Sequence, residues 1–376
     1  MIIIDSIQFI DLKTQHNRLQ HRIDEALKRV LAHGNYILGP EVEELEQALA
    51  AFSGAKHVVS CASGTDALLI ALMALGVKAG DAVFVPSFTF VATAEVVVLL
   101  GATPVFVDIN EGNYLISMAS LRAAIDVAKK LGLIPRVVIP VDLFGQPVDY
   151  DEVRRIAREY DLYIIADAAQ SFGGARAGRR VGTMAPITAT SFFPAKPLGC
   201  YGDGGALFTD DTDTADVFRS LRAHGQGKDK YDNVRIGVNG RLDTLQAAIL
   251  IEKLSIFEEE IEARQHVARR YNEALDDVVV TPKVASGAFS AWAQYTVRTE
   301  QRDRLAERLK EHKVPTAIYY PKPLHCQTAY LHYPTSPGGL PTSAKLAAEV
   351  LSLPMHPYLD ADTQDCIITW VRDAVT

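Results

Sequence analysis

The helix and strand signals that decide the fold lie together in residues 150–171, which read YDEVRRIAREYDLYIIADAAQS. Residues 150–160 have a helical pattern, and residues 162–166 form a short apolar run that ends at Asp167. A short apolar run next to a helix is typical of a parallel strand that is covered on both faces of its sheet. This stretch therefore predicts a buried strand with an acidic side chain at its carboxyl end.

The same alternation extends over the first two-thirds of the chain. Leu19, Ile23, Leu27 and Val30 recur at helical spacing, and Gly34 then supplies a stop signal. Alternating helices and strands predict an α/β fold with a mostly parallel sheet flanked by helices, in which ligand sites gather at the carboxyl ends of the strands. We expect further helices at residues 43–52, 62–75 and 92–100, and further strands at 57–60, 82–85, 104–107 and 136–140.

The last third of the chain has a different pattern. Residues 245–269 predict one long helix rich in Glu, Lys and Arg, and shorter elements follow at 293–298, 300–312 and 363–375. A length of 376 residues exceeds the usual size of a single domain. We therefore expect a large domain, residues 1–260, and a smaller C-terminal α/β domain, residues 261–376.

Composition excludes several classes of protein. Hydrophobic residues make up 48% of the chain and charged residues 22%, which is ordinary for a globular protein and argues against disorder. The formal net charge of −8 argues against a nucleic-acid partner, although a pocket can still be locally positive for an anionic small molecule. The four cysteines form no CxxC pair, so we expect reduced thiols and neither a metal site nor a disulfide framework.

The N-terminal residues and the apolar runs bear on location. Residues 1–5, MIIID, have neither the basic start nor the long apolar stretch of a signal peptide. Apolar runs such as residues 96–100 are far shorter than the roughly 20 residues that span a bilayer. We expect a cytoplasmic protein that does not associate with a membrane.

Lys196 is the first candidate for chemistry, because it lies among small and apolar residues in SFFPAKPLG at 191–199, with GDGG following at 202–205. A single lysine is most often a solvated surface charge. Apolar surroundings, however, disfavour the charged amine, and a neutral amine is what Schiff-base chemistry requires. The local sequence leaves both interpretations open.

Asp167 is the second candidate. A carboxylate at the end of an apolar strand loses its hydration unless it gains a partner. It is either a helix cap or buried hydrogen-bonded residue, or it pairs with the protonated nitrogen of a pyridinium ring and so keeps that ring an electron sink. The strand pattern alone does not distinguish these possibilities.

Two weaker signals precede these residues in the chain. Ser63, Gly64 and Thr65 open a helix, which makes them either a plain cap or an anion site formed by free N–H groups and the helix dipole. Phe90, in the run Phe88-Thr89-Phe90 that follows a predicted strand, is either a core residue or a face on which a flat ring stacks. An anion site, an aromatic ring, an acid and a lysine in this order are expected of fold-type I pyridoxal-phosphate (PLP) enzymes.

Longer motifs make the likeness specific. The chain resembles the DegT/DnrJ/EryC1/StrS family of sugar-nucleotide aminotransferases over essentially its whole length. Within the family it looks most like the members that aminate a UDP-2-acetamido-2-deoxy-3-oxo-glucuronic acid with glutamate as donor, a likeness strengthened by CY at 200–201 and SLPMHP at 352–357. The runs that carry the family resemblance are GPEV at 39–42, SGTDAL at 63–68, DAAQSFG at 167–173, SFFPAKPLGCYGDGGA at 191–206, NGRLDTLQAA at 239–248 and YPKPLH at 320–325.

The resemblance implies a set of cofactor contacts. Lys196 would hold PLP and then move the proton in each half-reaction, with pyridoxamine 5′-phosphate formed in between. Asp167 would hold the pyridine nitrogen, Gln170 would contact the ring hydroxyl, and Phe90 would stack on the ring. The phosphate would be bound by Gly64, Thr65, Ser191 and Asn239, the last from a neighbouring subunit, so the resemblance also implies a homodimer with shared sites.

The resemblance implies the substrate side as well. Arg241, with the segment that includes Tyr319, Tyr320, Lys322 and His325, would line the site for the sugar and its diphosphate. Some family members have histidine at the lysine position and remove a hydroxyl group instead, so Lys196 favours amine transfer, as for polysaccharide or O-antigen biosynthesis.

The similar members have a His-Tyr pair where this chain has Tyr319 and Tyr320, which opens alternatives. One is the same chemistry on a dTDP-linked keto-6-deoxyhexose or a 4-keto sugar. Another, from a different class of protein, is a regulatory or binding protein that keeps the fold without turnover.

Overall fold

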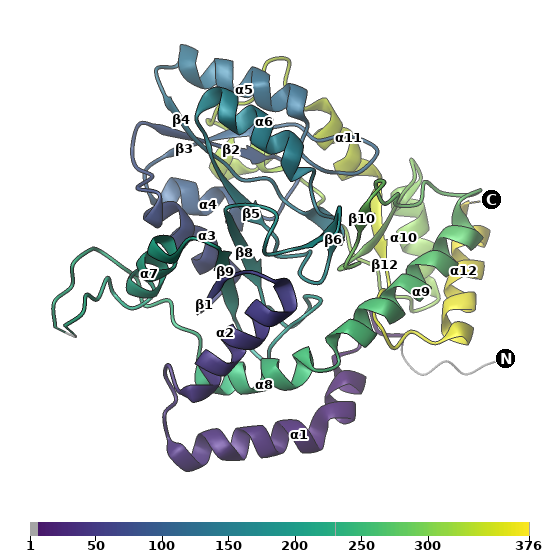
Figure 1. Ribbon diagram of the computed structural model, residues 1–376. Helices are drawn as coiled ribbons and strands as arrows, with labels where there is room; N and C mark the ends of the chain where they lie inside the picture. Colours follow the sequence, from purple (N-terminus) through teal and green to yellow (C-terminus); the bar gives the residue numbers. More distant parts are fainter. Residues whose placement is uncertain (1–6, 230, 376) are drawn as a thin grey trace.

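A seven-stranded sheet forms the centre of the computed structural model, which describes residues 7–229 and 231–375 (Figure 1). Strand β9 runs antiparallel to both of its neighbours, and the other neighbouring pairs of this sheet are parallel. In spatial order the strands are β1 (His57–Cys61), β9 (Gly205–Thr209), β8 (Ile187–Ser191), β5 (Tyr163–Asp167), β4 (Ile134–Val138), β2 (Asp81–Pro86) and β3 (Thr103–Val107).

Both faces of the sheet are buried, as strand β2 illustrates. Ala82 and Phe84 belong to the apolar core on one face, and Val83 and Val85 belong to the core on the other. Because successive side chains of a strand point to opposite faces, an unbroken apolar run is what a doubly covered strand needs. The prediction of a mostly parallel α/β sheet from such runs is confirmed.

The covering helices come from separate parts of the chain. The core on one face includes residues of α5 (Met118–Lys130), α6 (Tyr150–Tyr160) and α11 (Pro341–Glu349), and the core on the other includes α3 (Gly64–Ala74), α4 (Ala92–Leu99) and α7 (Thr212–Leu221). Near β1 and β9 lie α2 (Pro40–Ser53) and α8 (Thr244–Leu254), and α1 (Leu12–His33) runs along α8 (Figure 1).

Most of the expected elements are present, with shifted ends. The first helix stops at Gly34, whose φ of 72° is the left-handed conformation of a helix C-cap. The strand expected at 136–140 is β4, which begins and ends two residues earlier. The helix expected at 92–100 is α4, which ends one residue earlier, at Leu99. The pattern at residues 1–5, from which we expected no signal peptide, lies outside the described residues.

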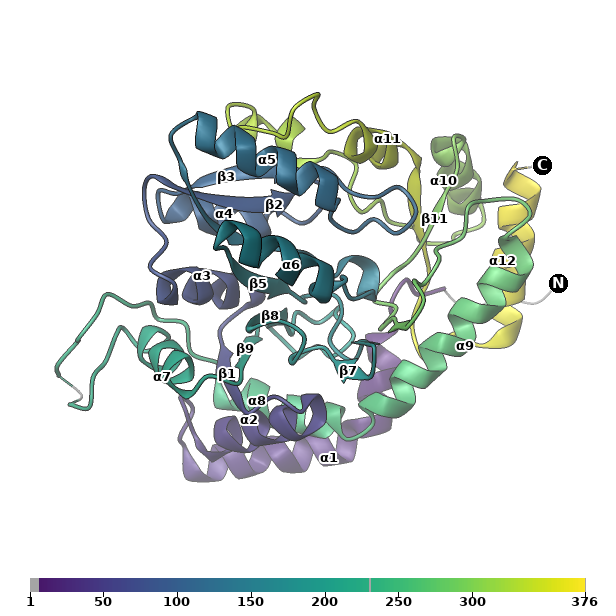
Figure 2. The same ribbon diagram turned by 45° about the horizontal axis from the view of Figure 1, so that its top comes forward.

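The single long helix expected over 245–269 is wrong, because the structure has two helices there. Helix α8 ends at Leu254, and α9 (Phe257–Leu275) begins three residues later. The Ser255 hydroxyl donates to the Glu252 carbonyl at 2.6 Å, a local bond that competes with the regular helix ladder. The break turns the chain, so that α9 runs from the base of the sheet toward the C-terminal elements (Figure 2).

The C-terminal elements build a second core around α9. It contains β11 (Tyr295–Arg298), antiparallel to β12 (Val350–Leu353), with α10 (Arg302–Glu311) and α12 (Ala361–Val375). Between them the chain returns to the main sheet, where Leu324 and Leu340 join its core. The division at residue 260 stays a prediction.

The remaining short elements are β6 (Ala175–Arg176), β7 (Arg179–Arg180), β10 (Ala288–Phe289), η1 (Leu143–Gly145), η2 (Leu324–Cys326) and η3 (Thr328–Tyr330).

The core beside β9 yields a prediction about stability. Phe172 is 2% exposed and is surrounded by four other phenylalanine rings. Phe172→Ala should lower the free energy of unfolding by about 3–5 kcal/mol, because it removes a large buried ring and leaves a cavity. Urea unfolding measures this, with Leu99→Ala as the control: Leu99 is 69% exposed, and its change should stay within about 0.5 kcal/mol. Equal effects of the two variants would contradict the buried position of Phe172.

Candidate active site

Asp167 is the last residue of β5 and is 5% exposed. The Thr93 hydroxyl donates to its Oδ2 at 2.8 Å, and the backbone N–H of Ala169 donates to its Oδ1 at 3.2 Å. Burial raises the pKa of Asp167, whereas these two donors and the charge of Lys196 oppose that rise. The carboxylate is therefore held from both sides at the carboxyl end of a central strand.

Lys196 lies in the loop that joins β8 to β9. Burial lowers the pKa of Lys196, and the charge of Asp167 works against that lowering. An amine that loses its proton easily and faces a buried carboxylate differs from a solvated surface lysine. The structure thus places Lys196 and Asp167 in one site, although the sequence separates them by a further strand, β8.

The loop that carries Lys196 is held by buried contacts. Its ends meet where the N–H of Cys200 donates to the carbonyl of Phe192 at 2.8 Å. Beneath it, the buried amine of Lys253 donates to the Gly199 carbonyl at 2.6 Å. The backbone of the loop that carries Lys196 is therefore held at its ends and supported by helix α8.

The N-terminus of helix α3 lies against the carboxyl end of β8. Ser63 caps the helix by accepting a hydrogen bond from the N–H of Asp66 at 3.0 Å. Gly64 and Thr65 are the first helical residues, whose N–H groups have no acceptor within the helix and favour an anion. A Cβ at Gly64 would lie 2.6 Å from the Cβ of Ser191, so only glycine allows this close approach. This cradle fits a phosphate group between α3 and β8.

The two phenylalanines that follow β2 have different surroundings. Phe88 is 1% exposed and belongs to the core, whereas Phe90 is 54% exposed. The ring of Phe90 lies 6.3 Å, centroid to centroid, from the ring of Tyr320. The core interpretation therefore applies to Phe88, and Phe90 retains an exposed aromatic face at the same end of the sheet.

Gln170 is buried and has both ends of its amide bonded. The backbone N–H of Phe144 donates to its Oε1 at 2.7 Å, and its Nε2 donates to the Tyr320 hydroxyl at 3.2 Å. Because the oxygen is occupied by a backbone donor, the NH₂ group points toward Tyr320. Burial raises the pKa of Tyr320, so its phenol stays protonated at neutral pH.

The segment after Tyr320 is held against the end of β2. His325 Nδ1 lies 2.6 Å from the Ser87 hydroxyl, and burial lowers the pKa of His325. Tyr319 is half-buried with its ring 5.7 Å from that of Tyr320, and Lys322 is exposed. The expected substrate residues of this segment therefore border the same site as Gln170.

Asn239 and Arg241 lie elsewhere in the chain's own structure. Both line a separate pocket of about 430 Å³, and the buried Nε of Arg241 has no hydrogen-bond partner among the described residues. The carbonyl of Gly240 accepts from the N–H of Ala62 at 3.0 Å, so the pocket adjoins the strand that leads into α3. Within residues 7–229 and 231–375, no hydrogen bond or ion pair joins Asn239 or Arg241 to Lys196 or Asp167. The pocket that Asn239 and Arg241 line is also lined by Ile37, Ala62, Gly202, Asp203, Asp243 and Gln246.

The sequence pattern did not indicate two residues that form hydrogen bonds in the site. Thr93, which bonds Asp167, lies in an apolar helix without any motif of its own. Phe144 contributes only a backbone N–H, which leaves no trace in the side-chain pattern. Thr89 and Thr93 are four residues apart, which is about one helical turn. This spacing is the single sequence signal that could have indicated that the two side chains lie together.

Two further properties concern the described part of the chain. None of its helices combines the length and the apolar character needed to pass through a bilayer. The same residues contain no group of three or more His, Cys, Asp or Glu side chains placed to bind a metal ion.

Comparisons with known proteins agree with this geometry. A sequence model of the DegT/DnrJ/EryC1/StrS aminotransferase family matches residues 17–372. UDP-2-acetamido-2-deoxy-3-oxo-D-glucuronate aminotransferase of Pseudomonas aeruginosa is 52% identical over 355 residues, which cover 94% of this chain and 96% of that protein.

Solved structures give the same result. A DegT DnrJ EryC1 StrS aminotransferase from Brucella abortus superposes with a TM-score of 0.97 at 54% identity, covering 98% of this chain and 99% of that one. NtdA from Bacillus subtilis, with bound cofactor PMP, has a TM-score of 0.88 at 29% identity, covering 99% of this chain and 86% of that one. The chain belongs to the DegT/DnrJ/EryC1/StrS family and is a PLP-dependent aminotransferase.

Proposed function

We propose that this enzyme transfers the amino group of L-glutamate to UDP-2-acetamido-2-deoxy-3-oxo-glucuronate, in the cytoplasm, for polysaccharide or O-antigen biosynthesis. The observation that carries the proposal is the interacting pair of the Lys196 amine, in the loop after β8, and the buried Asp167 carboxylate at the end of β5. The name and the 52% identity of the Pseudomonas aeruginosa relative support the choice of sugar.

Different residues around this pair bind different parts of the cofactor. Bound PLP supplies an aldehyde that reacts with amines and a ring that withdraws electrons from the reacting carbon. Gly64, Thr65 and Ser191 bind its phosphate in the cradle between α3 and β8. The exposed face of Phe90 would stack on the ring, and the amide NH₂ of Gln170, which donates to the Tyr320 hydroxyl in this structure, has a second N–H that would contact the ring hydroxyl.

Lys196 has two roles, which burial makes possible. Its amine would hold the cofactor aldehyde and would be freed when the donor amine takes its place. The freed amine would then move the proton in each half-reaction, which requires that it be neutral. The lowered pKa of Lys196 supports this role, and the Asp167 carboxylate would keep the ring nitrogen protonated.

The substrate side contains groups suited to an acidic sugar nucleotide. Arg241 has a planar fork of donors that can bind a carboxylate or phosphate through two oxygens, and its unpaired Nε supports such a role. Lys322 is exposed and adds a second cation. Tyr319, Tyr320 and His325 contribute hydroxyl and imidazole groups that can bond the hydroxyls of the sugar. These residues, more than the cofactor residues, determine which sugar is accepted.

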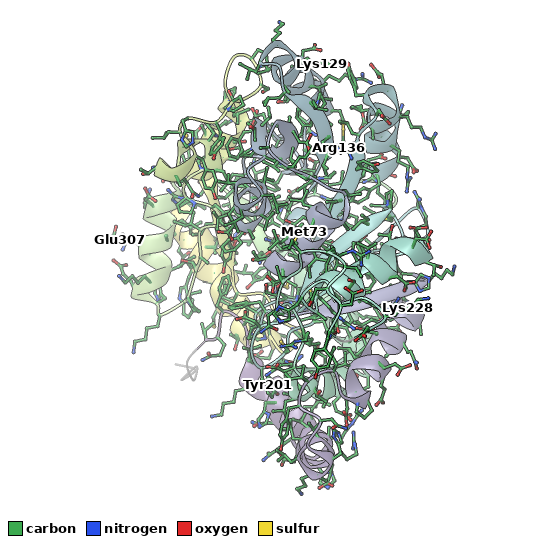
Figure 3. All side chains as sticks on the ribbon, turned by 90° about the vertical axis from the view of Figure 1, so that its left-hand side faces the viewer. Met73, Lys129, Arg136, Tyr201, Lys228 and Glu307 are labelled. Atoms are coloured by element: carbon green, nitrogen blue, oxygen red, sulfur yellow. The ribbon has the colours of Figure 1, made fainter. Side chains whose placement is uncertain are left out.

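The location of Asn239 and Arg241 supports a homodimer with shared sites. Both lie near the C-terminal end of the projecting loop, residues 222–229 and 231–243, which extends away from the body of the molecule (Figures 1 and 2). Figure 3 looks onto this side and labels Lys228 in the loop. Tyr231 and Ile236 of the loop are 88% and 87% exposed, which is unusual for large apolar side chains unless another chain covers them. A second copy of the chain is the occupant we propose.

The role of Lys196 leads to a direct prediction. Lys196→Ala should reduce amine transfer from glutamate by at least about 10²-fold, because it removes both the attachment to the cofactor and the base. Borohydride treatment of the unaltered protein, followed by mass spectrometry, should locate the cofactor adduct on Lys196. Lys253 is the internal control, since burial lowers its pKa to about 8 without placing it in the site. An adduct on Lys253 would refute the assignment.

The choice of sugar can be tested separately. With glutamate as donor, we expect turnover of UDP-2-acetamido-2-deoxy-3-oxo-glucuronate to exceed that of a dTDP-linked keto-6-deoxyhexose by about 10²-fold or more in kcat/KM, since buried polar groups discriminate strongly against a partner that lacks the matching group. Release of 2-oxoglutarate measures the rate. A preference for the dTDP-linked sugar would overturn the substrate while leaving the chemistry intact.

Sharing of the active site can be tested by mixing variants. A dimer of one Lys196→Ala chain and one Asn239→Ala chain has one site with both changes and one with neither. Random pairing should therefore restore about a quarter of the unaltered activity from two nearly inactive variants. If the mixture gives only the mean of the two separate preparations, Asn239 does not act in the site of another chain.

A further inference from the structure

Two buried threonines lie beside Asp167 and have no role in the function proposed above. Thr93, in the first turn of α4, is 0% exposed, and Thr89, in the segment before it, is 2% exposed. The Thr93 hydroxyl is 2.8 Å from Asp167 Oδ2, and the hydroxyl oxygens of Thr89 and Thr93 are 3.2 Å apart. The three side chains form a continuous path of hydrogen-bonding groups inside the protein.

The direction of this path follows from the chemistry of its end. An ionised carboxylate can only accept, so the proton of the Thr93 hydroxyl is given to Asp167. The Thr93 oxygen can then only accept from its other neighbour, which makes Thr89 the donor. Both hydrogen bonds point toward the carboxylate, and bonds aligned in this way strengthen one another.

We propose that Thr89 and Thr93 are positioning residues that hold Asp167 ionised and oriented toward the ring nitrogen of the cofactor. This deepens the proposed function and rests on it. With one donor on each oxygen, from Thr93 and from the N–H of Ala169, the carboxylate cannot rotate without losing a bond. Because Thr89 is next to Phe90 in the chain, one short segment positions both the stacking face and the partner of the ring nitrogen.

The charges around Asp167 make such donors necessary. Lys196 faces it from the loop after β8 and favours its ionised form. Asp142, fully buried after β4, has its pKa raised to about 7, mainly by burial and in part by the negative charge of Asp167, so the two carboxyl groups interact. The phenols of Tyr150 and Tyr320 also interact with the Asp167 charge. With a like charge nearby and little solvent, removal of one neutral donor should raise the pKa of Asp167.

Thr93→Val tests the proposal with little change of shape, since it replaces the hydroxyl by a methyl group. The full-length protein, freed of cofactor, is titrated with pyridoxamine 5′-phosphate by calorimetry at a series of pH values, because this form binds without attachment to Lys196. Binding requires ionised Asp167, so affinity falls on the acid side as Asp167 takes up a proton. We call this fall in affinity on the acid side the acid limb. In Thr93→Val the acid limb should move to higher pH by about one unit, because Asp167 loses a hydrogen bond to its charged form. At high pH the affinity should stay within about twofold of the unaltered protein, because Asp167 is ionised there in both proteins.

Matched variants separate this role from packing. Thr93→Ser retains the hydroxyl and should restore the acid limb to its original pH, whereas Thr89→Val should move it in the same direction by a smaller amount. If Thr93→Val does not fold, as judged by its thermal midpoint, the shift in Thr89→Val and its absence in Thr93→Ser decide the question. An acid limb that stays in place, or an equal loss of affinity at all pH values, would overturn the proposal. Unaltered protein that binds pyridoxamine 5′-phosphate but transfers no amine would instead refute the proposed function alone.

Discussion

Placing an ionised carboxylate inside an apolar sheet is the constraint on which the rest of the structure depends. Asp167 ends a strand whose other residues are almost entirely buried, and loss of hydration there disfavours its charged form. The protein offsets this cost with donors on both oxygens and a lysine nearby, rather than with a fully paired salt bridge. An acid that is incompletely paired inside the protein is suited to accept a further cationic group, such as a protonated ring.

The architecture explains how these groups come together from distant parts of the chain. In a parallel sheet the carboxyl ends of neighbouring strands lie at the same edge, so the loops after β2, β5 and β8 meet there. Strand β9 runs antiparallel between β8 and β1, and it brings Gly205 against Ser63, where a Cβ would lie 2.4 Å from the Ser63 carbonyl oxygen. The close packing of these strand ends brings the N-terminus of α3 against Ser191, where the loop that carries Lys196 begins.

The sequence predicted the parts of the site that depend on local pattern. The apolar run ending at Asp167 and the helix start at Gly64 follow from residue type and spacing alone, and both are where they were expected. The role of Lys196 needed a family resemblance, because nothing local distinguishes a buried lysine from a solvated one. Thr93 could not be found, since its bond to Asp167 spans 74 residues and depends on how α4 packs. The break at Ser255 was missed for a related reason: the charged pattern continues through it, and a single hydroxyl bond interrupts the helix.

The two halves of the site differ in how completely one chain forms them. The cofactor half includes the buried side chains Asp167 and Gln170, which are held by hydrogen bonds within the chain. On the other half, the Nε of Arg241 has no hydrogen-bond partner among the described residues, and Arg241 lies at the base of the projecting loop, where large side chains such as Ile236 are exposed. Buried and satisfied groups tolerate little change, whereas open groups can be adapted to a new partner. This division explains why the chemistry is evident from the core of the chain, while the identity of the sugar depends on residues such as Tyr319 at the rim.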